Sequence, residues 1–145
     1  MKKISAIICA VVLVLLCFSA CSNSIDGKWK LESVNIDEIM GSGNLVKYDF
    51  NGDLDMNADK SFTMTMSLSM VVSSGGPNTN NHEFTSTMNG IYEVNGETVK
   101  LNIKHTTTTQ DGSTGSTDDE ENIDGTFKDG KLYFEKNGMK MTFKK

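Results

Sequence analysis

Arginine is absent from this sequence. All 14 basic residues are lysine, and they stand against 19 acidic residues for a net charge of -5. The absence excludes any mechanism that needs the planar guanidinium fork, such as a bidentate clamp on a carboxylate or a phosphate. An acidic chain also repels phosphate backbones, so we expect no nucleic-acid partner.

Cysteine and proline are scarce. The three cysteines, Cys9, Cys17 and Cys21, all lie near the N-terminus, and Pro77 is the single proline. If the N-terminal leader is removed before Cys21, only that cysteine remains. The mature chain then has neither an intramolecular disulfide nor a multi-cysteine zinc site. We therefore expect a fold that is stabilised by packing.

The N-terminus has the features of an export signal. Lys2 and Lys3 precede an unbroken apolar run at residues 6–18, which is shorter than the roughly 20 residues that span a bilayer. The run ends in the sequence FSAC at residues 18–21, which resembles the lipobox of bacterial lipoproteins, with Phe where Leu is commonest. The resemblance implies that Cys21 is lipidated with acyl chains such as palmitate and becomes the new N-terminus.

These features divide the chain into a signal peptide at 1–20, a lipidated cysteine with a short tether at 21–24, and an exported domain at 25–145. Several acyl chains make membrane attachment effectively permanent. We expect the protein in the cell envelope, outside the cytoplasm, on the outer face of the cell membrane or in an outer membrane. The alternatives are an ordinary cleaved signal with a cysteine nearby, or an uncleaved anchor helix.

The exported domain shows the alternation of apolar and polar residues that is typical of β-strands. In the sequence SFTMTMSLSM at 61–70, all apolar side chains fall on one face and all Ser and Thr side chains on the other. The segments 98–104 and 139–144 repeat the pattern. Such strands have one buried and one solvated face, as in antiparallel sheets.

Turn residues separate these strands. Pairs of Asn or Asp with Gly favour tight hairpin turns, and they occur at 51–52, 95–96, 129–130 and 137–138. They predict a three-stranded meander from 123 to 144. Polar segments at 73–82 and 106–122 are expected to be loops, and one helical turn is expected at 37–40. A change of parity in the first strand predicts a bulge near Glu32–Ser33.

Together the segments predict an all-β domain of eight or nine strands. Consecutive hairpins favour an antiparallel up-and-down barrel over a Greek-key sandwich. The sequence also resembles small bacterial lipocalin-like lipoproteins, through Gly27-Lys28-Trp29 and through the hairpin segments 57–62 and 90–96. The resemblance implies a barrel with an apolar interior. In lipocalins the Trp closes one end beneath an Arg from near the chain end, a place that Lys144 or Lys145 must take here.

Methionine is the chemically notable side chain, with nine in the whole chain. Thioethers fill irregular cores, but a flexible Met-lined barrel can also accept an apolar ligand. We predict that the barrel interior, and any ligand site in it, contains Trp29, Phe62, Met64, Met66, Met88, Tyr92, His105 and Met141. His105 is included because it shares the parity of Val99, Leu101 and Ile103 at the end of their strand.

The sequence also offers two kinds of metal site as alternatives. The Met-x-Met pairs at 64–66 and 139–141 are soft ligands that suit Cu(I), but they share their faces with core residues. Alternating Asp and Asn residues at 49–59 suggest Ca²⁺. However, an EF-hand loop that begins at Asp55 has Lys60 and Met66 where Gly and Glu are needed. We expect no metal and no cofactor.

No nucleophile elbow or phosphate-binding glycine loop is present in the sequence, so we expect no enzymatic activity. The sequence favours a membrane-anchored binding protein for a small apolar or amphipathic ligand. The alternative is a non-catalytic interaction lipoprotein with a solid barrel, whose loops at 73–82 and 106–122 contact another envelope component. The ligand, the protein partner and the oligomeric state are not specified by the sequence.

Overall fold

The computed structural model describes residues 24–35, 45–73 and 79–145. These residues form nine strands: β1 (Gly27–Asn35), β2 (Leu45–Met56), β3 (Ser61–Ser73), β4 (Thr79–Asn95), β5 (Thr98–Gln110), β6 (Ser113–Thr117), β7 (Glu121–Lys128), β8 (Lys131–Lys136) and β9 (Met139–Lys144). Within these ranges no helix has the length and apolar character needed to cross a membrane. The leader, Cys21 and the helical turn expected at 37–40 lie outside the described residues.

The strands form a closed antiparallel barrel. Each strand pairs with its neighbour in sequence, except that β7 follows β5 in the ring, and the pairing of β1 with β9 closes it. The ring therefore has eight strands, and β6 is an extra strand that pairs with the outer half of β5. This confirms the predicted all-β, up-and-down barrel. All paired strands lie between Gly27 and Lys144, so a chain that starts at Ser22 contains the whole barrel.

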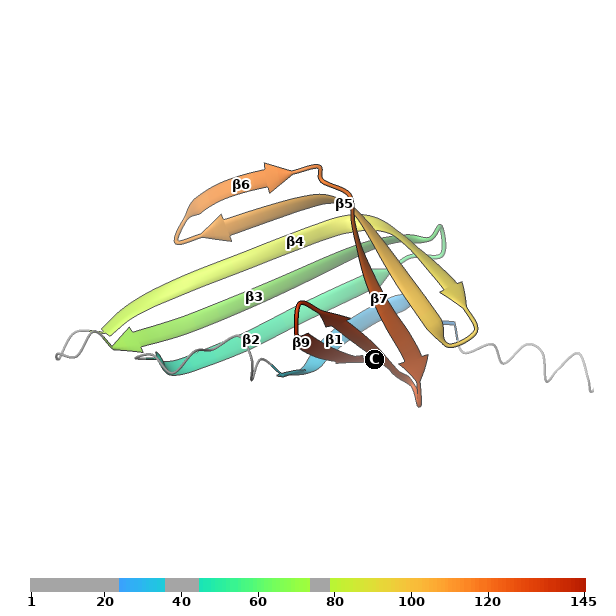
Figure 1. Cartoon of the computed structure of the whole chain (residues 1–145), viewed down its shortest axis with the longest axis horizontal. Helices are drawn as coiled ribbons and strands as arrows, with labels where there is room; N and C mark the ends of the chain where they lie inside the picture. Colours follow the sequence, from blue (N-terminus) through green and yellow to red (C-terminus); the bar gives the residue numbers. More distant parts are fainter. Residues whose placement is uncertain (1–23, 36–44, 74–78) are drawn as a thin grey trace, which may run out of the picture.

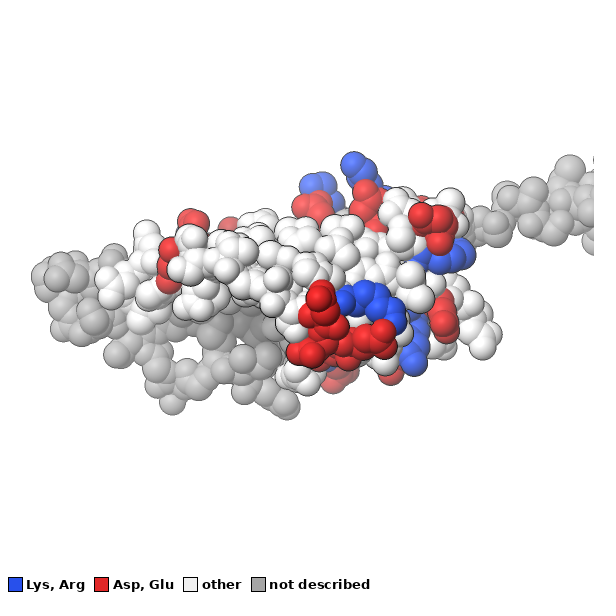
Figure 2. Space-filling model, turned by 90° about the horizontal axis from the view of Figure 1, so that it is seen from above, with Lys and Arg blue, Asp and Glu red and all other residues white. Residues whose placement is uncertain are grey.

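The long strands extend well beyond the short ones. Figure 1 shows β2, β3, β4 and the outer part of β5 running past β1, β7 and β9, with β6 along one edge. We call the part formed by 45–51, 67–73, 79–88, 105–110 and 113–117 the projecting sheet. On the face that Figure 2 shows, most of the charged side chains lie over the barrel, and few lie toward the tip of this sheet.

The predicted alternation is confirmed in the barrel strands. On β3, Phe62 and Met64 are buried, and Thr63 between them is only partly buried. Val99, Leu101 and Ile103 on β5 are fully buried, as is Phe143 on β9. One face of each strand therefore supplies the core, as the two-residue period requires.

Hairpin turns lie at three of the four predicted positions, and two of these turns share one backbone geometry. Asp129-Gly130 and Asn137-Gly138 have positive φ at both residues, as a type I′ turn requires. At the β4–β5 turn, Gly96 also has positive φ, followed by Glu97. Gly52, however, lies in the middle of β2 opposite Met66, so a turn there is wrong. A Cβ at Gly52 would lie 2.7 Å from the Met66 sulfur, so a larger residue there would require the Met66 side chain to move.

The two expected loops are also corrected, because both contain strand. Residues 79–82 belong to β4, residues 106–110 continue β5, and β6 follows at 113–117. Asp111-Gly112 forms the turn between β5 and β6, with positive φ at both residues. These segments lack apolar alternation because they lie in the projecting sheet outside the barrel core. Their threonines nevertheless favour extended structure.

Two bulges bend the barrel. The register of β1 against β9 shifts between Leu31 and Ser33, which confirms the bulge predicted there. A second shift lies between β4 and β5, where Lys104 is the extra residue between the pairs of Gly90 with Ile103 and Asn89 with His105. Glycine is required at 90, because a Cβ would overlap with the Asn102 carbonyl group. The second bulge reverses the parity of β5 beyond Ile103.

Candidate functional site

One end of the barrel is solid. We call it the packed end and define it by five residues that are at least 98% buried, Trp29, Tyr92, Leu132, Phe134 and Phe143. The rings of Phe134 and Phe143 meet edge to face, with centroids 6.1 Å apart. Such contacts add to the stabilisation from apolar burial.

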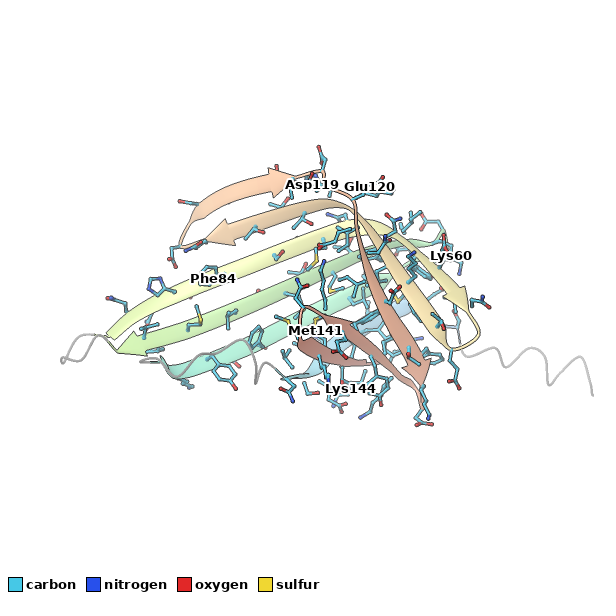
Figure 3. All side chains as sticks on the ribbon, viewed as in Figure 1. Lys60, Phe84, Asp119, Glu120, Met141 and Lys144 are labelled. Carbon is cyan, nitrogen blue, oxygen red and sulfur yellow. The ribbon has the colours of Figure 1, made fainter. Side chains whose placement is uncertain are left out.

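A partly open cavity of about 460 Å³, which we call the methionine chamber, lies at the other side of the barrel, where the barrel meets the projecting sheet. Five of its lining residues are methionines: Met64, Met66, Met88, Met139 and Met141. The other lining residues are Phe50, Ser86, Thr106, Glu121, Ile123, Lys136 and Asn137. Figure 3 shows Met141 where the short strands meet the long sheet, with Phe84 further out on β4.

Three strands position the methionines. Met64 on β3 lies directly opposite Met88 on β4, and β9 contributes Met139 and Met141 from its inward face. Met64 and Met141 are buried, and Met66, Met88 and Met139 are partly buried against the core. Thioether side chains have three rotatable bonds and adapt to irregular shapes. The chamber is thus lined by the side chains that adjust most easily to a guest molecule.

One ion pair between described residues lies at the rim of the methionine chamber. Lys136, at the end of β8, contacts the carboxylate of Glu121, at the start of β7. The Lys136 side chain is 22% exposed and the Glu121 side chain is 55% exposed. The lining is therefore apolar inside and polar at the rim. Such an arrangement suits a guest with an apolar body and a polar end.

Three of the predicted interior residues lie at the packed end and its border instead of in the chamber. Trp29, Phe62 and Tyr92 are all buried, so the prediction of an interior position is confirmed. The Trp29 indole nitrogen donates to the Ile25 carbonyl oxygen at 2.8 Å. Lys145, and not Lys144, lies over this ring, with its Nζ atom 4.9 Å from the centroid. Lysine thus takes the place that the lipocalin resemblance gives to arginine.

The Tyr92 hydroxyl group forms hydrogen bonds at the edge of the packed end. The hydroxyl donates to the Asp26 carboxylate and lies 2.8 Å from the Asn57 carbonyl oxygen. Burial, followed by the hydrogen bond to Asp26, raises the pKa of Tyr92. The same hydrogen bond lowers the pKa of Asp26, with help from Ser24. This polar contact ties the residue before β1 to β4.

His105 is not in the barrel interior, and the prediction that it lines the mouth is wrong. The bulge at Lys104 turns it to the outer face, where it pairs with Asn89, and Thr106 takes the inward position. The His105 Nδ1 atom lies 2.5 Å from Asp118, and its Nε2 atom lies 3.2 Å from the Thr107 hydroxyl.

The order hydroxyl, imidazole, carboxylate is the order found in hydrolase triads. Here, however, the Asp118 side chain is 87% exposed, and none of the three residues lines the methionine chamber or the outer groove described below. In this solvated setting the contacts orient His105 on the strand surface. They give no sheltered position for a substrate.

Four of the eight predicted residues therefore meet in the methionine chamber: Met64, Met66, Met88 and Met141. The prediction missed Met139, although it shares the inward parity of Met141. It also missed Lys136 and Glu121, because a charged residue at a strand end gives no sequence signal that it faces a cavity. Thr106 was missed because the bulge is not visible in the sequence.

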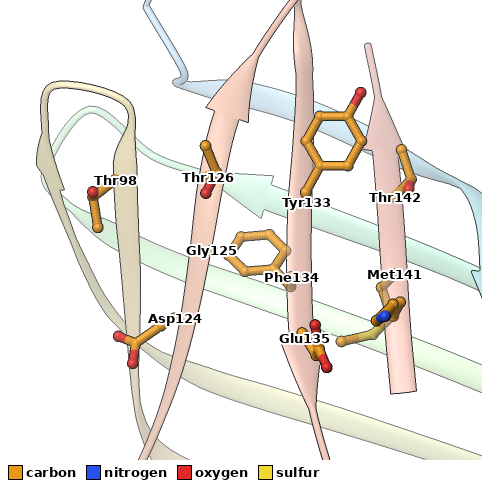
Figure 4. Close-up of a pocket in the computed structure, with 10 residues that line it drawn as sticks. Thr98, Asp124, Gly125, Thr126, Tyr133, Phe134, Glu135, Met141 and Thr142 are labelled. Atoms are coloured by element: carbon orange, nitrogen blue, oxygen red, sulfur yellow. The ribbon is translucent and has the colours of Figure 1, made fainter. Parts of the chain in front are cut away.

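A second depression lies on the outside of the barrel. It has a volume of about 560 Å³ and is lined mainly by outward side chains of β7, β8 and β9 (Figure 4). Thr126, Tyr133 and Thr142 form one row across these strands. The depression, which we call the outer groove, is larger than the methionine chamber but more open to solvent. It lacks the enclosed apolar lining that is typical of small-molecule sites.

The Asp and Asn residues of the alternative Ca²⁺ site lie on β2 up to Asp55, and Asn57 and Asp59 lie in the turn between β2 and β3. Asp49, Asn51 and Asp53 are exposed, and Asp53 pairs with Lys30 at 3.1 Å. Across the described ranges, no three His, Cys, Asp or Glu side chains are grouped so that they would hold a metal ion.

Comparisons of this chain with family models, with curated proteins and with solved structures found no match. The functional argument therefore depends on the geometry of the barrel.

Proposed function

We propose that this protein is an envelope lipoprotein, anchored through Cys21, whose barrel binds a small apolar or amphipathic molecule in the methionine chamber. One observation carries the proposal. A barrel with a densely packed end has, where it meets the projecting sheet, a cavity of about 460 Å³ whose lining includes five methionines. Small-molecule sites have volumes of roughly 300–1,000 Å³ and mainly apolar linings.

The energetics favour an apolar guest. Removing apolar surface from water contributes about 25 cal/mol per Å², and the chamber offers thioether and aromatic surface from Phe50 and the methionines. The flexible methionines lower the cost of fitting guests of different shape. An anchor at Cys21 would hold the barrel near the membrane, where apolar molecules partition.

The likeness to lipocalin-like lipoproteins supports the same proposal. An up-and-down barrel, a Trp at the head of β1 and a basic residue over its ring are the features that the resemblance implies, here as Trp29 and Lys145. No role in catalysis is proposed. The function lies in holding a molecule, and the barrel needs no cofactor for it.

The proposal is tested by filling the chamber. The domain from Ser22 to Lys145 is titrated with a neutral fluorescent probe such as N-phenyl-1-naphthylamine, which brightens in apolar sites. We expect binding to the wild-type domain and loss of binding in Ser86→Trp, because residue 86 lines the chamber. Thr85→Trp is the matched control, since it places the same ring on the outer face of β4, where Thr85 contacts Ser67.

If the Ser86→Trp and Thr85→Trp variants bind the probe alike, the probe occupies another surface and the methionine chamber is not the site. If the folded wild-type domain takes up no probe, the proposed binding function is wrong.

The anchor has its own test. Cys21→Ser is expressed with the native leader, and membrane and soluble fractions are compared by intact mass. We expect the wild-type protein in the membrane fraction with the mass of the acyl chains, and the variant without that mass. An unmodified wild-type protein would contradict the lipoprotein proposal and leave the chamber proposal standing.

The alternative function, contact with another envelope component, is favoured by one observation. Strand β6 pairs only with β5 among the described strands, and all of its residues are exposed. A free strand edge can add a strand from a partner. Replacing 111–117 by a short turn and repeating a pull-down discriminates, because an unchanged partner list counts against this function.

A further inference from the structure

Among the described residues that line the methionine chamber, Glu121 and Lys136 alone carry charge. They pair with each other, and the remaining polar lining residues, Ser86, Thr106 and Asn137, are neutral. The chamber therefore presents one cation and one anion to a guest. The charge that a guest must carry depends on which of these two side chains can leave the ion pair, because the side chain that stays needs a new partner of opposite charge.

The two partners differ in exposure. The Lys136 side chain is 22% exposed, whereas the Glu121 side chain is 55% exposed. A charge that is partly removed from water needs a partner of opposite sign, because an unpaired buried charge is costly. Glu121 regains water when it leaves the pair, and Lys136 does not. The least costly exchange therefore replaces the Glu121 carboxylate by an anionic group of the guest, so that Lys136 keeps a negatively charged partner.

The backbone allows this exchange. The ladder between β7 and β8 covers only Gly125–Lys128 against Lys131–Phe134. Residues 121–124 of β7 pair with β5 instead. The Glu121–Lys136 contact thus joins the two strands beyond the end of their ladder, and its opening breaks no hydrogen bond between them. Lys136 also pairs with Met139 across the hairpin, which places the ammonium group beside the thioether lining.

We propose that the ligand is a single-chain amphiphile with a carboxylate head, which pairs with Lys136 in place of Glu121 while its chain enters the methionine chamber. This inference rests on the proposed function and names its ligand class. A carboxylate fits better than a phosphate ester, because the lining offers one cation and no arginine, whereas phosphate sites commonly gather several charged donors. Glu121 acts as the internal competitor that holds Lys136 when the chamber is empty.

The test compares two ligands that differ only in the head group. Dodecanoate and dodecanol are used at neutral pH to displace the neutral fluorescent probe from the Ser22–Lys145 domain. We expect tighter binding of dodecanoate to the wild-type domain. Lys136→Met should weaken dodecanoate binding by about tenfold or more, the effect of losing one charge-assisted hydrogen bond. Dodecanol binding should change by less than about twofold, since its hydroxyl group forms no ion pair.

A second variant tests the competition. Glu121→Gln should strengthen dodecanoate binding several-fold and leave dodecanol unchanged, because the internal anion is gone. The neighbouring pair of Lys104 and Glu120 lies on the outer surface and supplies matched controls. Lys104→Met and Glu120→Gln should leave the affinity for both ligands as in the wild-type domain.

The outcomes separate the two proposals. If both ligands bind the wild-type domain equally and Lys136→Met changes neither, the carboxylate inference is wrong and the chamber remains an apolar site. If Lys104→Met weakens dodecanoate binding as much as Lys136→Met does, the effect comes from the net charge of the domain. The inference of a specific pair with Lys136 is then wrong. If neither ligand displaces the bound probe, the inference is wrong as well. If the fluorescent probe does not bind to the wild-type domain at all, the proposed binding function is wrong, and the carboxylate inference that rests on it is wrong too.

Discussion

The packed end and the methionine chamber are built from the same strands, yet they have opposite characters. On β9, Phe143 is fully buried at the packed end, and Met139, four residues earlier, lines an open cavity. On β4, Tyr92 fills the packed end and Met88 lines the chamber. The difference lies in side-chain type, with rigid rings in one half and flexible thioethers in the other.

In this small barrel, the packed end supplies the stability and the methionine chamber is left for binding. Aromatic side chains at the packed end bury much apolar area in fixed geometries and satisfy their polar atoms, as the Trp29 indole and the Tyr92 hydroxyl do. This half can hold the ring of strands closed without a disulfide. The other half is then free to keep a cavity, which a close-packed core would not contain.

Truncation at the packed end should have the largest effect on stability. Phe143→Ala removes a fully buried ring and leaves a void beside Phe134, so we expect the free energy of unfolding to fall by about 3–5 kcal/mol. Urea unfolding followed by tryptophan fluorescence measures it, because Trp29 is the single tryptophan. A loss below about 1 kcal/mol would show that this end is not the stabilising half.

The bulge between the two regions should be the next most sensitive point. Gly90→Ala places a Cβ against the Asn102 carbonyl group, and overpacking of this kind costs about 1–3 kcal/mol. Gly115→Ala on β6 is the matched control, because no atom lies within 4 Å of the added Cβ. Equal unfolding midpoints for the two variants would contradict the assigned role of Gly90.

Truncation in the chamber should cost far less than at the packed end. Met139→Ala enlarges a cavity that already exists, so only part of the transfer free energy of the side chain is lost, about 1 kcal/mol. We expect the same variant to change the affinity for the fluorescent probe. If Met139→Ala and Phe143→Ala destabilise the domain equally, the contrast between the two halves is wrong.

The smallest effect concerns acid stability at the packed end. Because Tyr92 lowers the pKa of Asp26 below its ordinary value of 3.8, the ionised Asp26 stabilises the folded chain above that value. This stabilisation is lost as the pH falls through the lowered pKa. Asp26→Asn should therefore be less stable than wild type at neutral pH, and the gap should close below about pH 4.

Urea midpoints across that pH range measure this gap. In a Tyr92→Phe background the Asp26→Asn substitution should have a smaller effect, since the main hydrogen bond is already missing. A gap that does not depend on pH would contradict the assigned cause.

Much of the barrel was predictable because alternation sorts side chains by face. The inward positions of Met64, Leu101 and Phe143 follow directly from a period of two. The turns at 129–130 and 137–138 were predictable for a local reason, since their dipeptides tolerate positive φ. The Asp111-Gly112 dipeptide also tolerates positive φ. The turn was not predicted there because the surrounding segment lacks apolar alternation.

What the sequence did not reveal depends on long-range register. The extra residue at Lys104 appears only when β4 and β5 are paired, and it exchanges the faces of His105 and Thr106. The position of Lys136 at a cavity also depends on where the β7–β8 ladder ends. Composition likewise left open whether the barrel is hollow, because methionine suits a core and a cavity equally well.

The most direct test of the central claim, that the methionine chamber holds a molecule, is mass spectrometry of material extracted together with the full-length protein. Wild type and the Ser86→Trp variant are purified from membranes side by side, with Thr85→Trp as control. We predict an amphiphile near one copy per chain in wild type and control, and its absence from Ser86→Trp. The same extracted material in all three preparations, or none in any, would contradict the claim.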